Sequence, residues 1–192
     1  REIYDMFGVI FDGHPDLLVY PFESQHHNLG DVRMHYLDEG AGKPLLMVHG
    51  NPTWSFYFRN LVKEFRPRRR VIAPDHIGCG LSDKPQRYRY TLARHAGNLE
   101  NLILSLDLRD IDLLVHDWGG PIGLSVATRH PERFDKIIIS NTAAFRSKDL
   151  PRLLWLARIP LMGEILIRGL NAFVQTTLIT ATAHPQRMRG AV

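Results

Sequence analysis

Short apolar runs that alternate with amphipathic segments constrain the fold of this chain more than any other feature. The runs are too short for helices and are typical of strands buried on both faces, whereas the segments between them place apolar residues at helical spacing. The expected strands are 32–37, 45–48, 70–73, 111–115 and 136–140, and the expected helices are 55–65, 91–106 and 119–130. This order predicts βαβ units and a mostly parallel, doubly wound sheet of the α/β class.

Polar residues follow these apolar runs directly. His49 to Asn51, Asp75, Asp117 and Asn141 each come immediately after one of them. Reactive groups in open α/β sheets gather where the strands end, at the carboxyl edge. We therefore expect these side chains to lie along one edge of the sheet.

The segment around Asp117 is the most informative. An apolar strand leads into His116-Asp117-Trp118, and Gly119 and Gly120 then open a helix. A turn this tight strains its central residue and pushes that side chain out above the sheet, beside backbone N–H groups at a helix N-terminus. An alternative is that Asp117 only caps the helix. The complete H-D-W-G-G context favours a nucleophilic carboxylate that forms a covalent ester.

A second motif, H-G-N-P at 49–52, follows an earlier strand. The backbone N–H groups of Asn51 and Trp118 are expected to form an oxyanion hole. The side-chain amide of Asn51 and the indole of Trp118 are further donors, which could hold a departing halide or another anion. The alternative is that Asn51 is a turn residue and Trp118 packs under a lid. Their pairing beside an aspartate elbow favours the functional interpretation.

These motifs, together with D-H-I-G-C-G-L-S-D-K-P at 75–85, resemble the haloalkane dehalogenase group of the α/β-hydrolase superfamily. Epoxide hydrolases share D-W-G but carry a bulky residue at the position of Asn51 and use lid tyrosines, whereas all six tyrosines here lie at or before Tyr90. The resemblance implies an α/β-hydrolase fold with a helical lid. It also implies an Asp117 nucleophile, a small hydrophobic substrate, and neither cofactor nor metal.

Three further segments, 76–80, 141–145 and 168–173, are similar to the dehalogenase-like β-lactone decarboxylases of bacterial long-chain olefin synthesis. This branch implies that Asp117 attacks a β-lactone and that loss of CO2 gives a cis-alkene, in assembly with other olefin-synthesis enzymes. Haloalkane hydrolysis and lactone decarboxylation both stay open. An alternative of another class is a non-catalytic α/β fragment or binding domain.

The family also needs a histidine base and an acid that orients it. No histidine has the expected position after a last strand, and Thr142 stands near the place where one branch carries its acid. We expect both residues beyond Val192, so that this chain alone cannot complete turnover. The predicted organisation is an incomplete hydrolase core over 1–145, with about six of eight strands, and the start of a helical lid over 146–192. The C-terminal core strands are expected to be absent.

Composition excludes other classes. No apolar stretch is long enough to span a membrane and no signal peptide is evident. A single cysteine allows no intrachain disulfide and fits a reducing cytosol, so we expect a cytoplasmic protein. The net charge is +4, but its one dense cluster, at Arg66 to Arg70, falls between a helix and a strand and does not predict nucleic-acid binding. The single cysteine, Cys79, is interpreted as a small buried residue in a structural loop, where Asp75 and Ser82 make local hydrogen bonds.

Overall fold

The computed structural model describes residues 20–144 and residue 159. By contacts the chain divides into two compact units, Glu2–Ala144 and Phe145–Val192 with Arg1. The predicted lid over 146–192 lies outside the described residues except for Ile159. The described elements are β1 (Gln25–Asn28), β2 (Arg33–Glu39), β3 (Pro44–Val48), η2 (Ser55–Phe58), α2 (Arg59–Phe65), β4 (Arg70–Pro74), α3 (Leu92–Ser105), β5 (Ile111–His116), α4 (Gly119–Arg129), η3 (Pro131–Arg133) and β6 (Phe134–Ser140).

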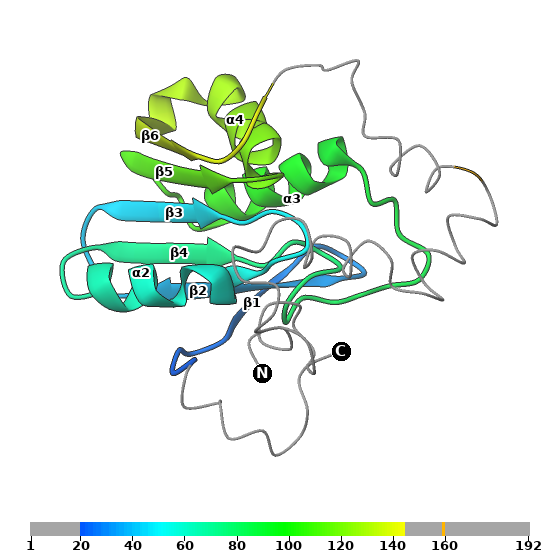
Figure 1. The fold of residues 1–192 in the computed structure, drawn as a ribbon, viewed down its shortest axis with the longest axis horizontal. Helices are drawn as coiled ribbons and strands as arrows, with labels where there is room; N and C mark the ends of the chain where they lie inside the picture. Colours follow the sequence, from blue (N-terminus) through cyan, green and yellow to red (C-terminus); the bar gives the residue numbers. More distant parts are fainter. Residues whose placement is uncertain (1–19, 145–158, 160–192) are drawn as a thin grey trace, which may run out of the picture. The chain divides into compact units, whose positions relative to one another are not determined.

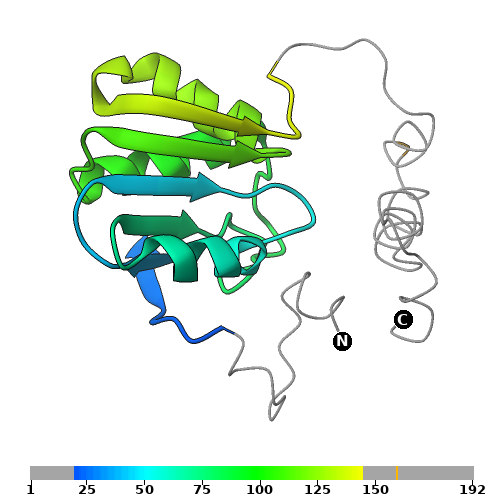
Figure 2. The ribbon, with the colours of Figure 1, turned by 60° about the vertical axis from the view of Figure 1, so that its left-hand side comes forward.

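The strands form one six-stranded sheet in the order β1-β2-β4-β3-β5-β6. β1 and β2 pair antiparallel with their neighbours, whereas β4, β3, β5 and β6 are parallel. The parallel strands therefore end at a common edge, which Figures 1 and 2 show by the shared direction of the arrows. This confirms the predicted mostly parallel sheet and brings the ends of β3, β4, β5 and β6 together.

Helices cover both faces of the sheet (Figure 1). Successive side chains of a strand point to opposite faces. Along β3, Leu46 and Val48 therefore pack in the core under α3 and α4. Leu45 and Met47 pack in a second core with Val62 of α2. The continuous apolar run of β3 thus reflects burial on both faces, as the sequence predicts.

Three elements differ from the sequence prediction. The helix expected over 55–65 is split, because a 3-10 turn, η2, precedes α2. β1 was not predicted, since its sequence, QHHN, contains no apolar residue. The run at 136–140 was expected to be buried, but β6 is the last strand described in its sheet and is largely exposed, with Ile139 61% exposed.

The basic cluster between α2 and β4 is held in ion pairs. Each of its arginines lies against a carboxylate: Arg66 with Glu39 (3.1 Å), Arg68 with Glu64 (3.2 Å), Arg69 with Asp112 (2.8 Å) and Arg70 with Asp38 (2.7 Å). The partners come from α2 and from strands β2 and β5, so the cluster ties the loop before β4 to the sheet. Charge that appears concentrated in the sequence is therefore paired in the structure.

Candidate active site

Asp117 lies in a sharp turn between β5 and α4, with a backbone φ of +51°. This left-handed conformation is uncommon for a residue other than glycine and indicates a constrained site. A Cβ atom at Gly119 would lie 2.1 Å from the carbonyl oxygen of Val48, so only glycine allows the turn to pack this closely on the end of β3. The structure thus has the strained strand-to-helix turn that the sequence predicts.

The Asp117 carboxylate points toward the loop after β3. The backbone N–H of Asn51 donates to Asp117 Oδ1 at 2.8 Å. A Cβ atom at Gly50 would lie 2.2 Å from the same oxygen, so glycine is required for this approach. Among the described residues Asp117 Oδ2 has no hydrogen-bond partner, which leaves that oxygen available to attack a carbon atom.

Helix capping does not account for Asp117. The N-cap residue of α4 is Trp118, and no side-chain hydrogen bond caps the helix. The carboxylate is instead held by Asn51, a residue 66 positions earlier in the chain. The contact that fixes this side chain is therefore tertiary.

Asn141 and Thr142, which directly follow β6, hydrogen-bond to the turn at Asp117. The backbone N–H of Asp117 donates to the carbonyl oxygen of Asn141 at 3.3 Å. The hydroxyl of Thr142 donates to the carbonyl oxygen of Asp117. A Cβ atom at Gly120 would lie 2.0 Å from that hydroxyl, so the contact depends on glycine there. Asn141 was predicted at this edge, but no sequence pattern indicates the role of the Thr142 hydroxyl.

The two proposed donors, Trp118 and Asn51, are both exposed to solvent. Trp118 directly follows Asp117 and is 50% exposed. Asn51 is also exposed, and its side-chain Oδ1 lies 3.6 Å from the sulfur of Cys79. Both residues thus reach solvent at the carboxyl edge, whereas their roles as anion donors stay predictions.

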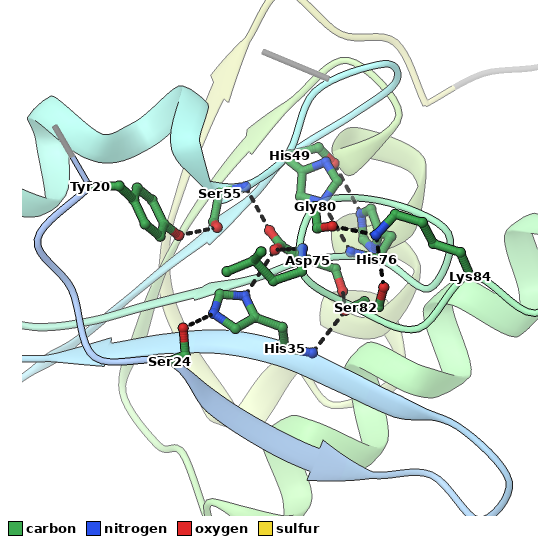
Figure 3. Close-up of polar contacts among 11 residues, drawn as sticks. Tyr20, Ser24, His35, His49, Ser55, Asp75, His76, Gly80, Ser82 and Lys84 are labelled. Atoms are coloured by element: carbon green, nitrogen blue, oxygen red, sulfur yellow. Dashed lines mark hydrogen bonds and ion pairs between the residues drawn. The ribbon is translucent and has the colours of Figure 1, made fainter. Parts of the chain in front are cut away.

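A buried polar network anchors the loops that surround this edge (Figure 3). Asp75, at the end of β4, is fully buried. Its Oδ1 accepts the backbone N–H of Ser55 at 2.7 Å. Its Oδ2 accepts the backbone N–H of Leu81 at 2.9 Å and Nδ1–H of His35 at 2.8 Å. Burial raises the pKa of Asp75, but these hydrogen bonds and nearby histidines outweigh it and hold that pKa below its usual value.

Asp75 and Ser82 were expected to bond locally. Ser82 does so, because its hydroxyl donates to the carbonyl oxygen of Asp75 at 2.6 Å, but it also accepts the backbone N–H of His35. The Asp75 carboxylate reaches 20 and 40 residues back along the chain. The loop is therefore structural, as predicted, but its bonds join three separate segments.

Two buried histidines link the loops after β3 and β4 (Figure 3). His49 Nδ1–H donates to the carbonyl oxygen of Gly50 at 2.8 Å, and His49 Nε2 accepts the backbone N–H of His76 at 3.0 Å. His76 Nε2–H donates back to the carbonyl oxygen of His49. Burial lowers the pKa of both rings. Since both ring nitrogens of His49 are engaged in hydrogen bonds, this histidine links the two loops and does not act as a general base.

No described histidine hydrogen-bonds the Asp117 carboxylate. The ring of His116, the residue before Asp117, stacks on Tyr57 with centroids 4.6 Å apart. Within residues 20–144 no group of three or more His, Cys, Asp or Glu side chains is arranged to hold a metal ion. In the same part of the chain, no helix has the length and apolar character of a membrane span.

The fold and the turn at Asp117 define the class of protein. A family model described as alpha/beta hydrolase fold matches residues 43–188, and the chain belongs to this family. A model of the respiratory-chain NADH dehydrogenase 30 Kd subunit also matches residues 1–30, most of which lie outside the described part.

Two curated proteins are similar to this chain over most of its length. The chain is 49% identical over 159 residues to a cis-3-alkyl-4-alkyloxetan-2-one decarboxylase from Shewanella oneidensis, covering 80% of this chain and 50% of the relative. It is 37% identical over 177 residues to haloalkane dehalogenase 2 from Mycobacterium bovis, covering 90% of this chain and 61% of the relative. The chain thus spans about half the length of the first of these relatives.

Solved structures agree with this placement. Haloalkane dehalogenase DbeA from Bradyrhizobium elkani is 28% identical with a TM-score of 0.74, over 82% of this chain and 57% of that chain. Haloalkane dehalogenase DpaA from Paraglaciecola agarilytica is 34% identical with a TM-score of 0.67, over 77% of this chain and 55% of that chain. The resemblance inferred from the motifs is therefore confirmed at the level of family and fold.

Proposed function

We propose that the complete protein is an enzyme in which Asp117 Oδ2 attacks an electrophilic carbon atom and forms a covalent ester. The observation that carries this proposal is the hydrogen bond from Asn51 N–H to Asp117 Oδ1. It orients one carboxylate oxygen and leaves the other without a partner among the described residues. The same N–H would stabilise negative charge on Oδ1 whenever the ester carbonyl is attacked.

The substrate class we favour is a β-lactone with two alkyl substituents. The support is the 49% identity to a cis-3-alkyl-4-alkyloxetan-2-one decarboxylase, compared with 37% to a haloalkane dehalogenase. Attack of Asp117 on C4, the saturated ring carbon bonded to the ring oxygen, forms the ester, breaks the bond between C4 and that oxygen, and releases the lactone carboxyl group as a carboxylate. Loss of CO2 then forms the C=C bond, expels Asp117 and balances all atoms without water.

Asn51 and Trp118 have a role in this scheme as donors to the leaving group. Ring opening puts a negative charge on a departing carboxylate, and an amide or indole N–H lowers the free energy of that charge. The backbone contact of Asn51 with Asp117 and the place of Trp118 directly after Asp117 in the chain support this role. The protein could work with other olefin-synthesis enzymes, since its substrate must be supplied by a reaction that closes a β-lactone ring.

Haloalkane hydrolysis is the second candidate, favoured by the solved structures of haloalkane dehalogenases that share the fold. In this reaction Asp117 displaces halide and water hydrolyses the ester. A general base must then activate the water. Because no histidine ring in residues 20–144 bonds Asp117, the proposal places that base outside the described residues.

The test compares two substrates on the complete protein, a cis-3,4-dialkyl-β-lactone and a 1-bromoalkane. Alkene and CO2 from the lactone, without halide release from the bromoalkane, select the decarboxylase. Bromide release, with solvent ¹⁸O entering the Asp117 carboxylate, selects the hydrolase, because only that route adds water to the ester.

Asp117→Asn is expected to lower either activity by roughly 10⁴-fold or more. Asp110→Asn is the matched control, because Asp110 has the same left-handed backbone, with φ +51°, and directly precedes the strand that Asp117 follows. Equal activity of the two variants would refute the assignment of Asp117 as the nucleophile. A complete protein that turns over neither substrate would favour the non-catalytic alternative.

A further inference from the structure

Cys79 lies in a loop whose backbone is fixed on both sides. Its N–H donates to the carbonyl oxygen of His76 at 2.8 Å, and its own carbonyl oxygen accepts the N–H of Ser82 at 3.1 Å. The flanking glycines, Gly78 and Gly80, have φ values of +95° and +49°, a region that other residues rarely adopt. The position of the Cys79 side chain is therefore set by its loop.

The Cys79 thiol contacts the side chain of Asn51. Its sulfur lies 3.6 Å from Asn51 Oδ1, within reach of an S–H···O hydrogen bond. Burial, with the nearby Asp75 carboxylate, raises the pKa of Cys79 to about 12, so the thiol keeps its proton at neutral pH. A protonated thiol donates to the amide oxygen and is a poor nucleophile.

In this contact the oxygen of the Asn51 amide faces Cys79. Oxygen and nitrogen occupy opposite branches of a planar amide, so holding the oxygen against Cys79 turns the nitrogen away from it. Among the described residues Asn51 Nδ2 has no hydrogen-bond partner. The same residue holds Asp117 Oδ1 through its backbone N–H. One residue thus holds the carboxylate through its backbone N–H and carries a side-chain NH2 group without a partner among the described residues.

We propose that Cys79 is a positioning residue, which holds the Asn51 amide with its nitrogen free to bind the negative charge of the leaving group. This inference rests on the proposed function, because it assigns the anion to the same site. Cys79 acts only through Asn51 and does not react with the substrate.

The buried Asp75 carboxylate keeps the two sides of this contact together. It accepts the N–H of Leu81 in the Cys79 loop and the N–H of Ser55, four positions after Asn51. Both loops are therefore tied to one fully buried anion, which Figure 3 shows between them. A weak thiol bond can fix an exposed amide here because the two backbones are already held in place.

A double-mutant cycle on the complete protein tests the proposal. Cys79→Ala is expected to lower kcat/KM by about threefold to tenfold, the range of one hydrogen bond, while Cys79→Ser regains part of the loss. In an Asn51→Ala background, Cys79→Ala should change kcat/KM by less than about twofold, since the group it positions is gone. An equal loss in both backgrounds would show a general structural role and overturn the proposal.

A second measurement does not depend on turnover. The side-chain NH2 signals of Asn51 in an ¹⁵N-correlated NMR spectrum are identified by their loss in Asn51→Ala. They should shift in Cys79→Ala and return toward their original position in Cys79→Ser, and unshifted signals overturn the inference. If Asp117→Asn retains activity, the proposed function fails. If it is inactive but the cycle is additive, only the role of Cys79 fails.

Discussion

Replacing Gly50 by alanine tests the geometry of the site most directly. A Cβ atom there would lie 2.2 Å from Asp117 Oδ1, 2.5 Å from Asp117 Cβ and 2.6 Å from the backbone nitrogen of Trp118. Real Cβ atoms do not approach other atoms this closely, so the loop or the turn must move. Overpacking costs about 1–3 kcal/mol, and loss of the charge-assisted bond from Asn51 costs about 1.5–3 kcal/mol. Because the two effects share one displacement, we expect a total of about 2–4 kcal/mol.

The matched control is Gly97→Ala in α3. A Cβ atom at Gly97 meets nothing within 4 Å, and alanine is favoured over glycine inside a helix by about 0.5–1 kcal/mol. Urea unfolding of the complete protein should therefore show Gly50→Ala destabilised and Gly97→Ala slightly stabilised. Ester formation at Asp117, followed by mass spectrometry, should fall by about 10²-fold or more only in Gly50→Ala. Wild-type stability and ester formation in Gly50→Ala would refute the close approach of the two loops.

Three further outcomes are expected. Asp75→Asn should lower the free energy of unfolding in urea by about 3–5 kcal/mol, because an amide offers N–H groups where Oδ2 now accepts two donors. A decrease of less than about 1 kcal/mol would contradict the anchoring role of the Asp75 network. The free energy of unfolding should fall as the pH drops below about 6.5, because His49 and His76 have lowered pKa values when folded and take up protons only when unfolded. A free energy of unfolding that is independent of pH between 7 and 5 would contradict this role of the two histidines. In the 192-residue chain, Ile139→Lys should reduce self-association in size-exclusion chromatography, because a charged side chain disfavours pairing between exposed strand edges. Ile139→Val should leave self-association unchanged. Equal elution of the two variants would argue against pairing through β6.

The elements that the sequence predicts well are those whose signal is local. Apolar runs identify β3, β4 and β5, because a strand buried on both faces has few polar positions; in β5 the one buried polar residue, Asp112, is paired with Arg69. The turn at Asp117 is evident from the glycines after it, since the backbone needs small residues there whatever surrounds it. Edges are harder to predict: β6 has the composition of a buried strand, and its exposure depends on what lies beside it.

The candidate site likewise has features that the sequence indicates and contacts that it does not. The order of residues already identifies Asp117 and its likeness to an aspartate nucleophile, and it indicates that Asn51 and Trp118 belong to the same edge. Sequence gives no sign that Thr142 holds the back of the turn or that Cys79 contacts Asn51. These contacts join residues 25 and 28 positions apart.

Sequence alone thus determines which residues are chemically able to act, because turn conformation and strand burial leave a local pattern of glycines and apolar side chains. Only the tertiary structure decides which partner each of them has. A carboxylate such as Asp75 is compatible with a local turn or with a buried anchor. The choice follows from which N–H groups the packed sheet brings within hydrogen-bond distance. The orientation of Asp117, with one oxygen held and the other free, is a property of the fold and not of its motif.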